Sequence, residues 1–246
     1  MDAEQKKALK ERFDTVRERI EKASGGRDVT LLAATKTVSA EVINYATREL
    51  SLKYIGENKV QELLEKYPYI EKDGIEIHFI GGLQTNKVRQ IIDKVDMIQS
   101  LDSIRLAEEI DKRAAKIGKV MPVLVEINIG REPEKGGIMP EDAESFIREA
   151  VGLKNIKICG LMTMAPARIT EEEYKRYFSE VKEIYDRIKE LNIEGADMKT
   201  LSMGMSDSYE AAAYCGADLV RVGSALFGKR VYKETEPQKQ RTDIIT

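Results

Sequence analysis

A lysine ends the first apolar stretch of the chain that suits a buried strand. Residues 29–34 (VTLLAA) are followed by Lys36, and a helix is expected to begin at Ser39. Lys36 shares one face of the strand with Leu32, because successive side chains point to opposite faces. If Leu32 faces the interior, Lys36 does too, and burial favours the neutral, nucleophilic amine. Position alone leaves two interpretations open: a Schiff base with a carbonyl compound, or an ion pair with a carboxylate such as Glu126.

Two glycine-containing turns near the end of the chain could bind an anion. Residues 203–208 (MGMSDS) lead into a helix expected to begin near Ser206, and a second turn lies at Gly223 and Ser224. Backbone N–H groups and a helix N-terminus bind phosphate in such turns. Either motif alone favours an ordinary capped turn. The two together, with an inward lysine, favour a phosphate site.

Composition excludes several classes of site. The sequence has one histidine, His78, and two cysteines, Cys159 and Cys215, so a histidine-cluster metal site and a disulfide framework are both excluded. The net charge of −3 gives no electrostatic argument for binding nucleic acid or a membrane surface. No apolar run approaches the roughly 20 residues of a membrane span, and the charged N-terminus is unlike a signal peptide. We therefore expect a cytoplasmic protein without a metal site.

The elements that would position these residues alternate regularly. The opening helix, expected at about residues 3–24, places Leu9, Phe13, Val16 and Ile20 on one face. Strand-like runs lie at residues 29–35, 53–58, 75–82, 96–101, 121–130, 156–164, 200–206 and 217–224. Each run is followed by a helical or turn segment, a pattern that predicts an α/β fold: a (β/α)8 TIM barrel. We expect one domain over residues 1–246, with a polar tail at about 232–246.

Active sites of such barrels lie at the carboxyl ends of the strands. The polar residues expected there are Lys36, Glu57, Asn58, His78, Glu126, Asn128, Thr163, Ser202, Ser206 and Arg221. Asp102, after the fourth strand, is expected to cap the following helix. Residues 131–137 (REPEKGG) are interpreted as a surface loop rather than a mobile lid.

A Schiff-base lysine, a phosphate-binding turn and a nearby arginine suggest pyridoxal 5'-phosphate (PLP). The pyridine nitrogen of this cofactor needs an Asp or Arg partner, and Arg221 is the candidate. Arginine does not give up a proton, so it would leave that nitrogen unprotonated and weaken the cofactor as an electron sink. A salt bridge from Arg221 to a barrel carboxylate is the alternative.

Eight motifs in one order resemble a known family. They are LLAATKT, IGENKVQE, IHFIGGLQTNK, SLDS, VEINIGREPEKGG, GLMTM, LSMGMSDSYEAA and VRVGSALFG. Over about residues 5–230 the chain resembles the YggS/PROSC family of pyridoxal phosphate homeostasis proteins, which have the fold of the alanine racemase N-terminal barrel. The resemblance implies PLP bound as an aldimine on Lys36, with Arg221 facing the pyridine nitrogen. It also implies phosphate contacts from Ser206, Gly223 and Ser224, and ring neighbours Asn58, His78 and Met203.

One position departs from the family, which usually reads HFIGHLQ where this chain has Gly82 in place of the second histidine. Family members resemble cofactor carriers or regulators rather than enzymes. Racemisation needs an acid/base group on each face of the substrate carbon, which related racemases obtain from a second domain. That domain also carries the racemase dimer contacts, and this chain ends soon after its eighth strand.

We therefore expect a monomer, not an enzyme, that buffers PLP or delivers it to PLP-dependent apo-enzymes. The alternatives are a single-domain amino-acid racemase and an aldolase-like barrel. The racemase would use a tyrosine, Cys159 or a water on the second face, and the aldolase-like barrel would use Lys36 without a cofactor.

Overall fold

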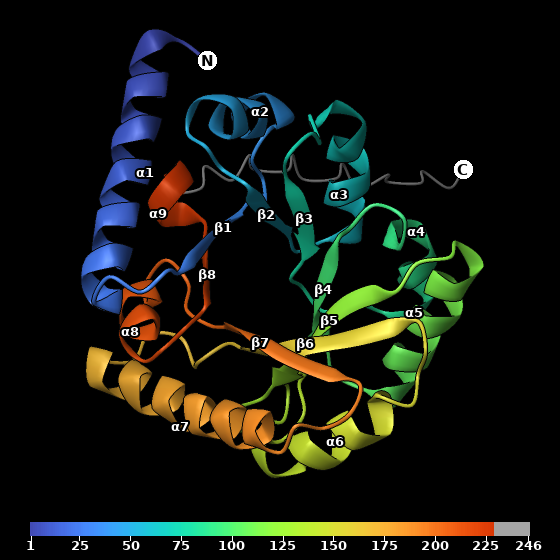
Figure 1. The fold of residues 1–246 in the computed structure, drawn as a ribbon. Coiled ribbons are helices and arrows are strands. Elements are labelled where there is room, and N and C mark those ends of the chain that lie inside the picture. Colours follow the sequence, from blue (N-terminus) through green and yellow to red (C-terminus); the bar gives the residue numbers. More distant parts are fainter. Residues whose placement is uncertain (229–246) are drawn as a thin grey trace, which may run out of the picture.

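The strands form a closed barrel. The computed structural model describes residues 1–228, in which eight parallel strands pair in sequence order and β1 pairs with β8 (Figure 1). The predicted (β/α)8 barrel is thereby confirmed, and the expected tail at 232–246 lies outside the described residues. The strands are β1 Thr30–Ala34, β2 Tyr54–Glu57, β3 Glu76–Phe79, β4 Met97–Leu101, β5 Met121–Ile127, β6 Ile156–Thr163, β7 Ala196–Ser202 and β8 Leu219–Val222.

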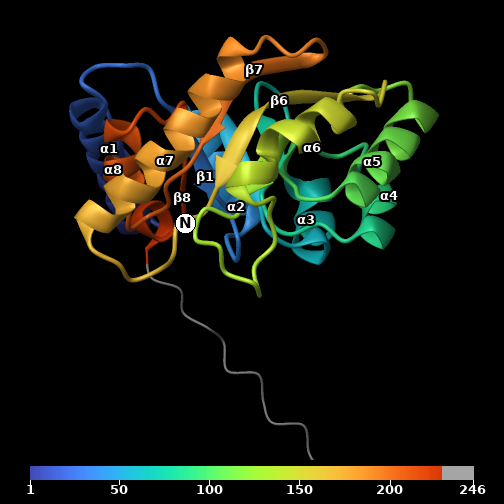
Figure 2. The same cartoon turned by 90° about the horizontal axis from the view of Figure 1, so that it is seen from below.

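Helices surround the barrel on its outside, as the view in Figure 2 also shows. They are α1 Ala3–Ser24, α2 Ala40–Glu49, α3 Val60–Lys66, α4 Val88–Ile91, α5 Ile104–Lys116, α6 Ala143–Ala150, α7 Glu171–Glu190, α8 Tyr209–Tyr214 and α9 Ser224–Phe227, with 3-10 turns at Tyr67–Tyr69, Thr85–Lys87 and Pro140–Asp142. Within residues 1–228, none of these helices combines the length and apolarity needed to cross a membrane.

Helix α1 packs beside α8 and α9, next to the β1–β8 pair (Figure 1). A capping box between Asp2 and Gln5 begins the helix, and Gly25 ends it in the left-handed conformation at φ 65°. The face that the sequence predicts is the one that is buried, and it consists of Leu9, Phe13, Val16 and Ile20. This helix therefore covers the barrel where its first and last strands meet.

Strand β7 begins earlier than the sequence pattern indicates. The expected strand was residues 200–206, whereas β7 spans Ala196–Ser202 and pairs with β6 from its first residue. The segment 196–199 (ADMK) lacks an apolar run, so only its pairing identifies it as a strand. A Cβ at Gly160, whose φ is 148°, would lie 1.9 Å from the Thr200 carbonyl oxygen. Glycine is therefore required where β6 and β7 approach each other.

The barrel interior has a small apolar cluster of its own. Leu32, Ile80 and Leu219 pack together there, separate from the larger core between strands and helices. Leu32 therefore faces the interior, which is the condition under which Lys36 was expected to do the same. A Cβ at Gly56 would lie 2.5 Å from Leu32 Cδ2, so a larger residue on β2 at this level would require the Leu32 side chain to move.

Candidate cofactor site

Lys36 follows β1 and lines a cavity at the carboxyl end of the barrel. Its side chain is half-buried, and the cavity of about 530 Å³ lies between the end of β1, α1, α2 and α9. Gly223 and Ser224 line the same cavity, here called the Lys36 cavity. Lys36 and Glu126 do not form the alternative ion pair, since no carboxylate of residues 1–228 lies within 4.0 Å of the Lys36 amine. The lysine and one of the two predicted turns are therefore neighbours in space.

The chain around Lys36 is held in an uncommon conformation. Thr37 has φ 65°, which is strained for a β-branched residue. Its N–H donates to Glu62 Oε2 at 2.9 Å, so a side chain of α3 holds the strained residue in place. We call residues 35–37 the lysine loop.

A buried ion pair fixes the other side of the lysine loop. Lys66 Nζ lies 2.5 Å from Glu57 Oε1 and donates to the Thr35 carbonyl at 2.8 Å, while Thr35 Oγ1 donates to Glu57 Oε1 at 2.6 Å. Burial raises the pKa of Glu57, and the charge and hydrogen bond of Lys66 oppose that rise. Glu57 Oε2 is buried without a hydrogen-bond partner among residues 1–228. The Glu57–Lys66 pair therefore places a buried charge directly below the lysine loop.

The second predicted turn is joined to the first through Ser206. Its Oγ accepts hydrogen bonds from the backbone N–H groups of Gly223 at 3.1 Å and Ala225 at 3.2 Å. The helix expected near Ser206 begins three residues later, since α8 starts at Tyr209. Since Ser206 Oγ only accepts in these two bonds, its own proton is available to an anion. Ser206, Gly223 and Ser224 thus lie together beside the Lys36 cavity.

Arg221 is buried inside the barrel and bound to neutral oxygens. It is 3% exposed, and it donates from Nη1 to Ser202 Oγ at 2.7 Å and from Nη2 to the Thr163 carbonyl at 2.8 Å. Among the described residues no carboxylate lies within ion-pair distance, so the alternative of a direct salt bridge is not realised. Burial lowers the pKa of Arg221 to about 10, against the opposing charge of Glu126. The guanidinium therefore remains charged at neutral pH.

His78 lies in the barrel interior and is linked to Arg221. Its Nδ1 lies 2.8 Å from Gln99 Nε2 and its Nε2 lies 3.3 Å from Glu76 Oε2. Ser202 Oγ donates to Gln99 Oε1 at 2.7 Å and so completes the connection. We call this row, formed by Arg221, Ser202, Gln99, His78 and Glu76, the interior chain.

Gln99 was not singled out from the sequence. The available signal was an amide within the apolar run 96–101, at a position that alternation places on the face opposite its neighbours Ile98 and Ser100. Its partners could not be read from that signal, because they come from β3 and β7.

One carboxylate, Glu126, lies close enough to Arg221 for their charges to interact, and Asp102 lies near Glu126 in turn. Burial raises the pKa of Glu126 to about 7, the Asp102 charge adds to the rise and the Arg221 charge opposes it. The expectation that Asp102 caps α5 is wrong: Ser103 Oγ accepts from Leu106 N–H at 3.3 Å and provides the cap. The Asp102 carboxyl therefore does not cap the helix, and its charge contributes to the raised pKa of Glu126.

We expect the stability of the cofactor-free protein to fall as the pH rises toward neutrality. A carboxyl whose pKa rises on folding, here from 4.5 to about 7, stabilises the folded state when protonated. The contribution of Glu126 to the free energy of unfolding should therefore fall by at most about 3 kcal/mol as the pH rises from below 4.5 through 7. Urea unfolding across this pH range measures the decline, and Glu126→Gln should remove most of it. An equally steep decline in that variant would contradict the assignment.

The loop over this end of the barrel is tied down. Asn128 Nδ2 donates to the Glu132 carbonyl at 2.9 Å, and the Glu132 N–H donates back to Asn128 Oδ1 at 3.1 Å. Ile138 then returns to pair with Ile127, next to the end of β5. The segment 131–137 is thus a surface loop closed by Asn128, as expected.

Asn58, Met203 and Gly82 have different surroundings. Asn58 is half-buried after β2, and a Cβ at Gly81 would lie 2.1 Å from the Asn58 carbonyl oxygen. At Gly82, which is exposed, an added Cβ would meet no atom within 4 Å, so the position has room for a side chain. Met203 is fully buried in the core outside the strands, away from the interior. The cofactor contacts of Asn58, His78 and Met203 stay predictions.

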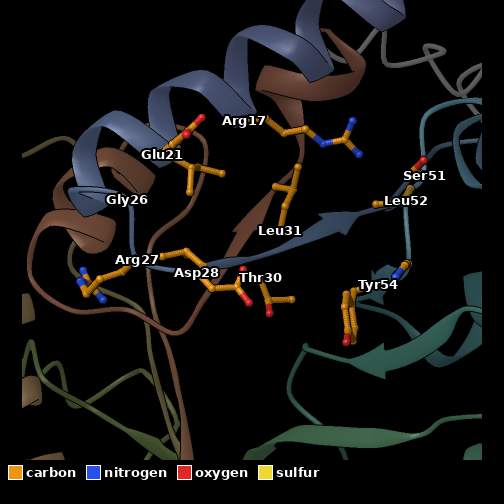
Figure 3. A pocket seen from close by; sticks show the side chains of 13 residues that line it. Arg17, Glu21, Gly26, Arg27, Asp28, Thr30, Leu31, Ser51, Leu52 and Tyr54 are labelled. Atoms are coloured by element: carbon orange, nitrogen blue, oxygen red, sulfur yellow. The ribbon is translucent and has the colours of Figure 1, made fainter.

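A second cavity, of about 590 Å³, lies at the amino end of β1 and contains none of the predicted site residues (Figure 3). Its two arginines are engaged by helix ends: Arg17 donates to the Leu50 carbonyl and Arg27 to the Ala213 carbonyl. Among residues 1–228 no group of His, Cys, Asp and Glu side chains is arranged to hold a metal ion. The Lys36 cavity is therefore the candidate site, because Lys36, Gly223 and Ser224 line it together.

Both the sequence and the fold are similar to those of known proteins. The family described as alanine racemase, N-terminal domain, matches residues 5–231. The pyridoxal phosphate homeostasis protein of Aquifex aeolicus is 43% identical over 228 residues, which cover 90% of this chain and 98% of that protein. This chain belongs to the pyridoxal phosphate homeostasis protein family. The pyridoxal phosphate homeostasis protein of Escherichia coli K12 is 35% identical over 211 residues, which cover 84% of this chain and 88% of that protein.

Solved structures of relatives agree with the family. PipY of Synechococcus elongatus with PLP bound is 29% identical, with a TM-score of 0.78 over 89% of this chain and 100% of that chain. PipY without PLP gives 30% identity and a TM-score of 0.80 over the same shares. An alanine racemase from Clostridium difficile is 17% identical, with a TM-score of 0.66, and shows likeness of fold alone. The alanine-racemase type of barrel is thus confirmed.

Proposed function

We propose that this protein binds PLP on Lys36 and serves intracellular PLP homeostasis by binding, buffering or delivering the cofactor. One observation carries the proposal: Lys36 lines one cavity with the Gly223–Ser224 turn. Arg221, two residues before that turn, is buried and donates only to neutral oxygens. The names of the relatives and the PLP bound to PipY support the same cofactor.

The residues present fit the cofactor. The cavity of about 530 Å³ is within the range of roughly 300–1,000 Å³ for small-ligand sites. Ser206 has a hydroxyl proton to donate to a phosphate, and the turn at Gly223 and Ser224 begins a helix. When bound, the cofactor would supply an aldehyde carbon, and Lys36 would supply the amine that holds it.

The surroundings of Arg221 suit storage better than turnover. A guanidinium donates hydrogen bonds and keeps its protons, so facing the pyridine nitrogen it would leave that nitrogen unprotonated. Carbanion chemistry on the cofactor is weakened as a result. Cys159, one candidate for a second acid/base group, lies in the first half of β6, and its Sγ donates to the Lys157 carbonyl at 3.4 Å. Burial raises the pKa of this thiol, which makes it a poor proton exchanger at neutral pH.

The proposal includes that the protein is a cytoplasmic monomer and that the recipients of PLP are PLP-dependent apo-enzymes. A transfer experiment tests it. The PLP-loaded protein is mixed with an apo-enzyme, and recovery of the apo-enzyme's activity is compared with recovery on free PLP at the measured dissociation rate. Recovery faster than dissociation supports delivery, and recovery at that rate supports buffering. Failure to retain PLP after gel filtration overturns both. Rapid α-deuteration of amino acids in heavy water would instead favour the racemase.

A further inference from the structure

The interior chain has a single direction. Arg221 donates to Ser202, Ser202 donates to Gln99 Oε1, and Gln99 Nε2 meets His78 Nδ1. The other ring nitrogen, Nε2, meets a carboxylate oxygen of Glu76. Arginine can only donate and a carboxylate can only accept, so every bond between them is oriented the same way.

This direction determines which way the Gln99 amide is oriented and which ring nitrogen of His78 carries the proton. Gln99 must present its NH2 group to His78, because its oxygen accepts from Ser202. His78 must then carry its proton on Nε2, which donates to Glu76. The pKa of Glu76 is lowered first of all by this hydrogen bond, as expected for an accepting carboxylate.

The middle of the chain is shielded from water. Gln99 and Ser202 are fully buried and His78 is 2% exposed. The Tyr54 ring packs edge-on against the His78 ring, with centroids 5.8 Å apart, and Tyr54 also lines the second cavity in Figure 3. In such surroundings a broken link leaves a buried polar group unpaired, so the links form and break together.

The two ends of the chain differ in exposure and in position. Arg221 is buried and directly precedes the β8 end that leads to the Lys36 cavity. Glu76 is the first residue of β3, at the amino end of the barrel, and its side chain is 53% exposed. A surface group at one end of the barrel is thus joined by hydrogen bonds to the residue expected to face the cofactor at the other.

We propose that the interior chain is a coupling device, in which Ser202, Gln99, His78 and Glu76 are positioning residues for Arg221. The inference rests on the proposed function, since its consequence is a change in PLP affinity. A change at exposed Glu76 should alter how firmly Arg221 is oriented toward the ring nitrogen, although Glu76 touches no part of the Lys36 cavity.

The first test concerns the chain itself and needs no cofactor. His78 is the only histidine in the sequence, so nitrogen-15 NMR of histidine-labelled protein reports its ring without ambiguity. We expect the neutral ring of the cofactor-free protein to carry its proton on Nε2. A proton on Nδ1 would overturn the direction of the chain, whatever the protein binds.

The second test measures coupling as a double-mutant cycle on PLP dissociation constants. Glu76→Gln should weaken PLP binding by about threefold to tenfold. In a Ser202→Ala background, where the chain is cut, Glu76→Gln should have no further effect. Ser100→Ala is the matched control background, because Ser100 is also buried and its Oγ has no hydrogen-bond partner among residues 1–228. Asp73→Asn, an exposed carboxylate just before β3, should leave the constant unchanged.

The outcomes separate this inference from the proposed function. Unchanged PLP affinity in Glu76→Gln, or an equal effect in the Ser202→Ala background, overturns the coupling while PLP binding stands. If the parent protein binds no PLP, the proposed function fails, and the coupling inference fails with it even where the histidine tautomer is as expected. A loss of affinity that disappears only when Ser202 is replaced supports the inference.

Discussion

Lys36→Ala is expected to abolish covalent attachment of PLP. Lys36 is the one lysine among the described residues that line the cavity, so no other amine is available there to the aldehyde. The absorbance band of the Schiff base should be absent from the variant. Borohydride, which reduces a Schiff base to a stable amine, should label Lys36 in the parent protein and no lysine in the variant, as read by peptide mass mapping.

Lys53→Ala is the matched control for this prediction. Lys53 also lines a cavity, but it is exposed and its cavity lies at the amino end of the barrel. Its replacement should leave both the absorbance and the label on Lys36 intact. Labelling of Lys53 in the parent, or an unchanged spectrum in Lys36→Ala, would contradict the assignment of the site.

Local pattern was enough to predict the barrel, and it singled out Lys36, Gly223 and Ser224, which line one cavity. Regular alternation of apolar runs and helical spacing indicates eight units, and strand parity places Lys36 on the face of Leu32. Glycine-containing turns predict where Ser206 and Gly223 lie, because turn chemistry depends on neighbouring residues. These features need no knowledge of which distant segments touch.

Contacts between distant segments could not be read in the same way. The hydrogen bonds that link His78, Gln99 and Ser202 depend on the register of β3, β4 and β7. That register is the sum of the offsets between all the neighbouring strands that lie between them. The choice of Ser103 over Asp102 as the α5 cap depends on a one-residue difference in where the helix begins. The Glu57–Lys66 pair joins the end of β2 to the last turn of α3, and helical spacing alone pairs Lys66 only with Glu62.

Lys66→Met is expected to lower the free energy of unfolding by about 3–5 kcal/mol, the cost of removing one partner of a buried ion pair. The Glu57 side chain is 0% exposed, and it would lose its counterion. The Thr35 carbonyl would lose one of its two donors and keep the Val38 N–H, next to a Thr37 already in a strained conformation. Urea unfolding of the cofactor-free variant and parent measures the difference.

We attribute the loss of stability in Lys66→Met to the unpaired charge of Glu57 rather than to lost packing. A double variant separates these two causes. Glu57→Gln/Lys66→Met leaves no buried charge at this position, so it should recover most of the stability that Lys66→Met loses. Lys59→Met, at an exposed lysine before α3, should change stability by no more than about 0.5 kcal/mol. If the double variant is as unstable as Lys66→Met, packing rather than charge holds the loop.

If charge is the cause, borohydride trapping at Lys36 should slow in Lys66→Met and return toward the parent rate in the double variant, because the lysine loop is held by the same contacts.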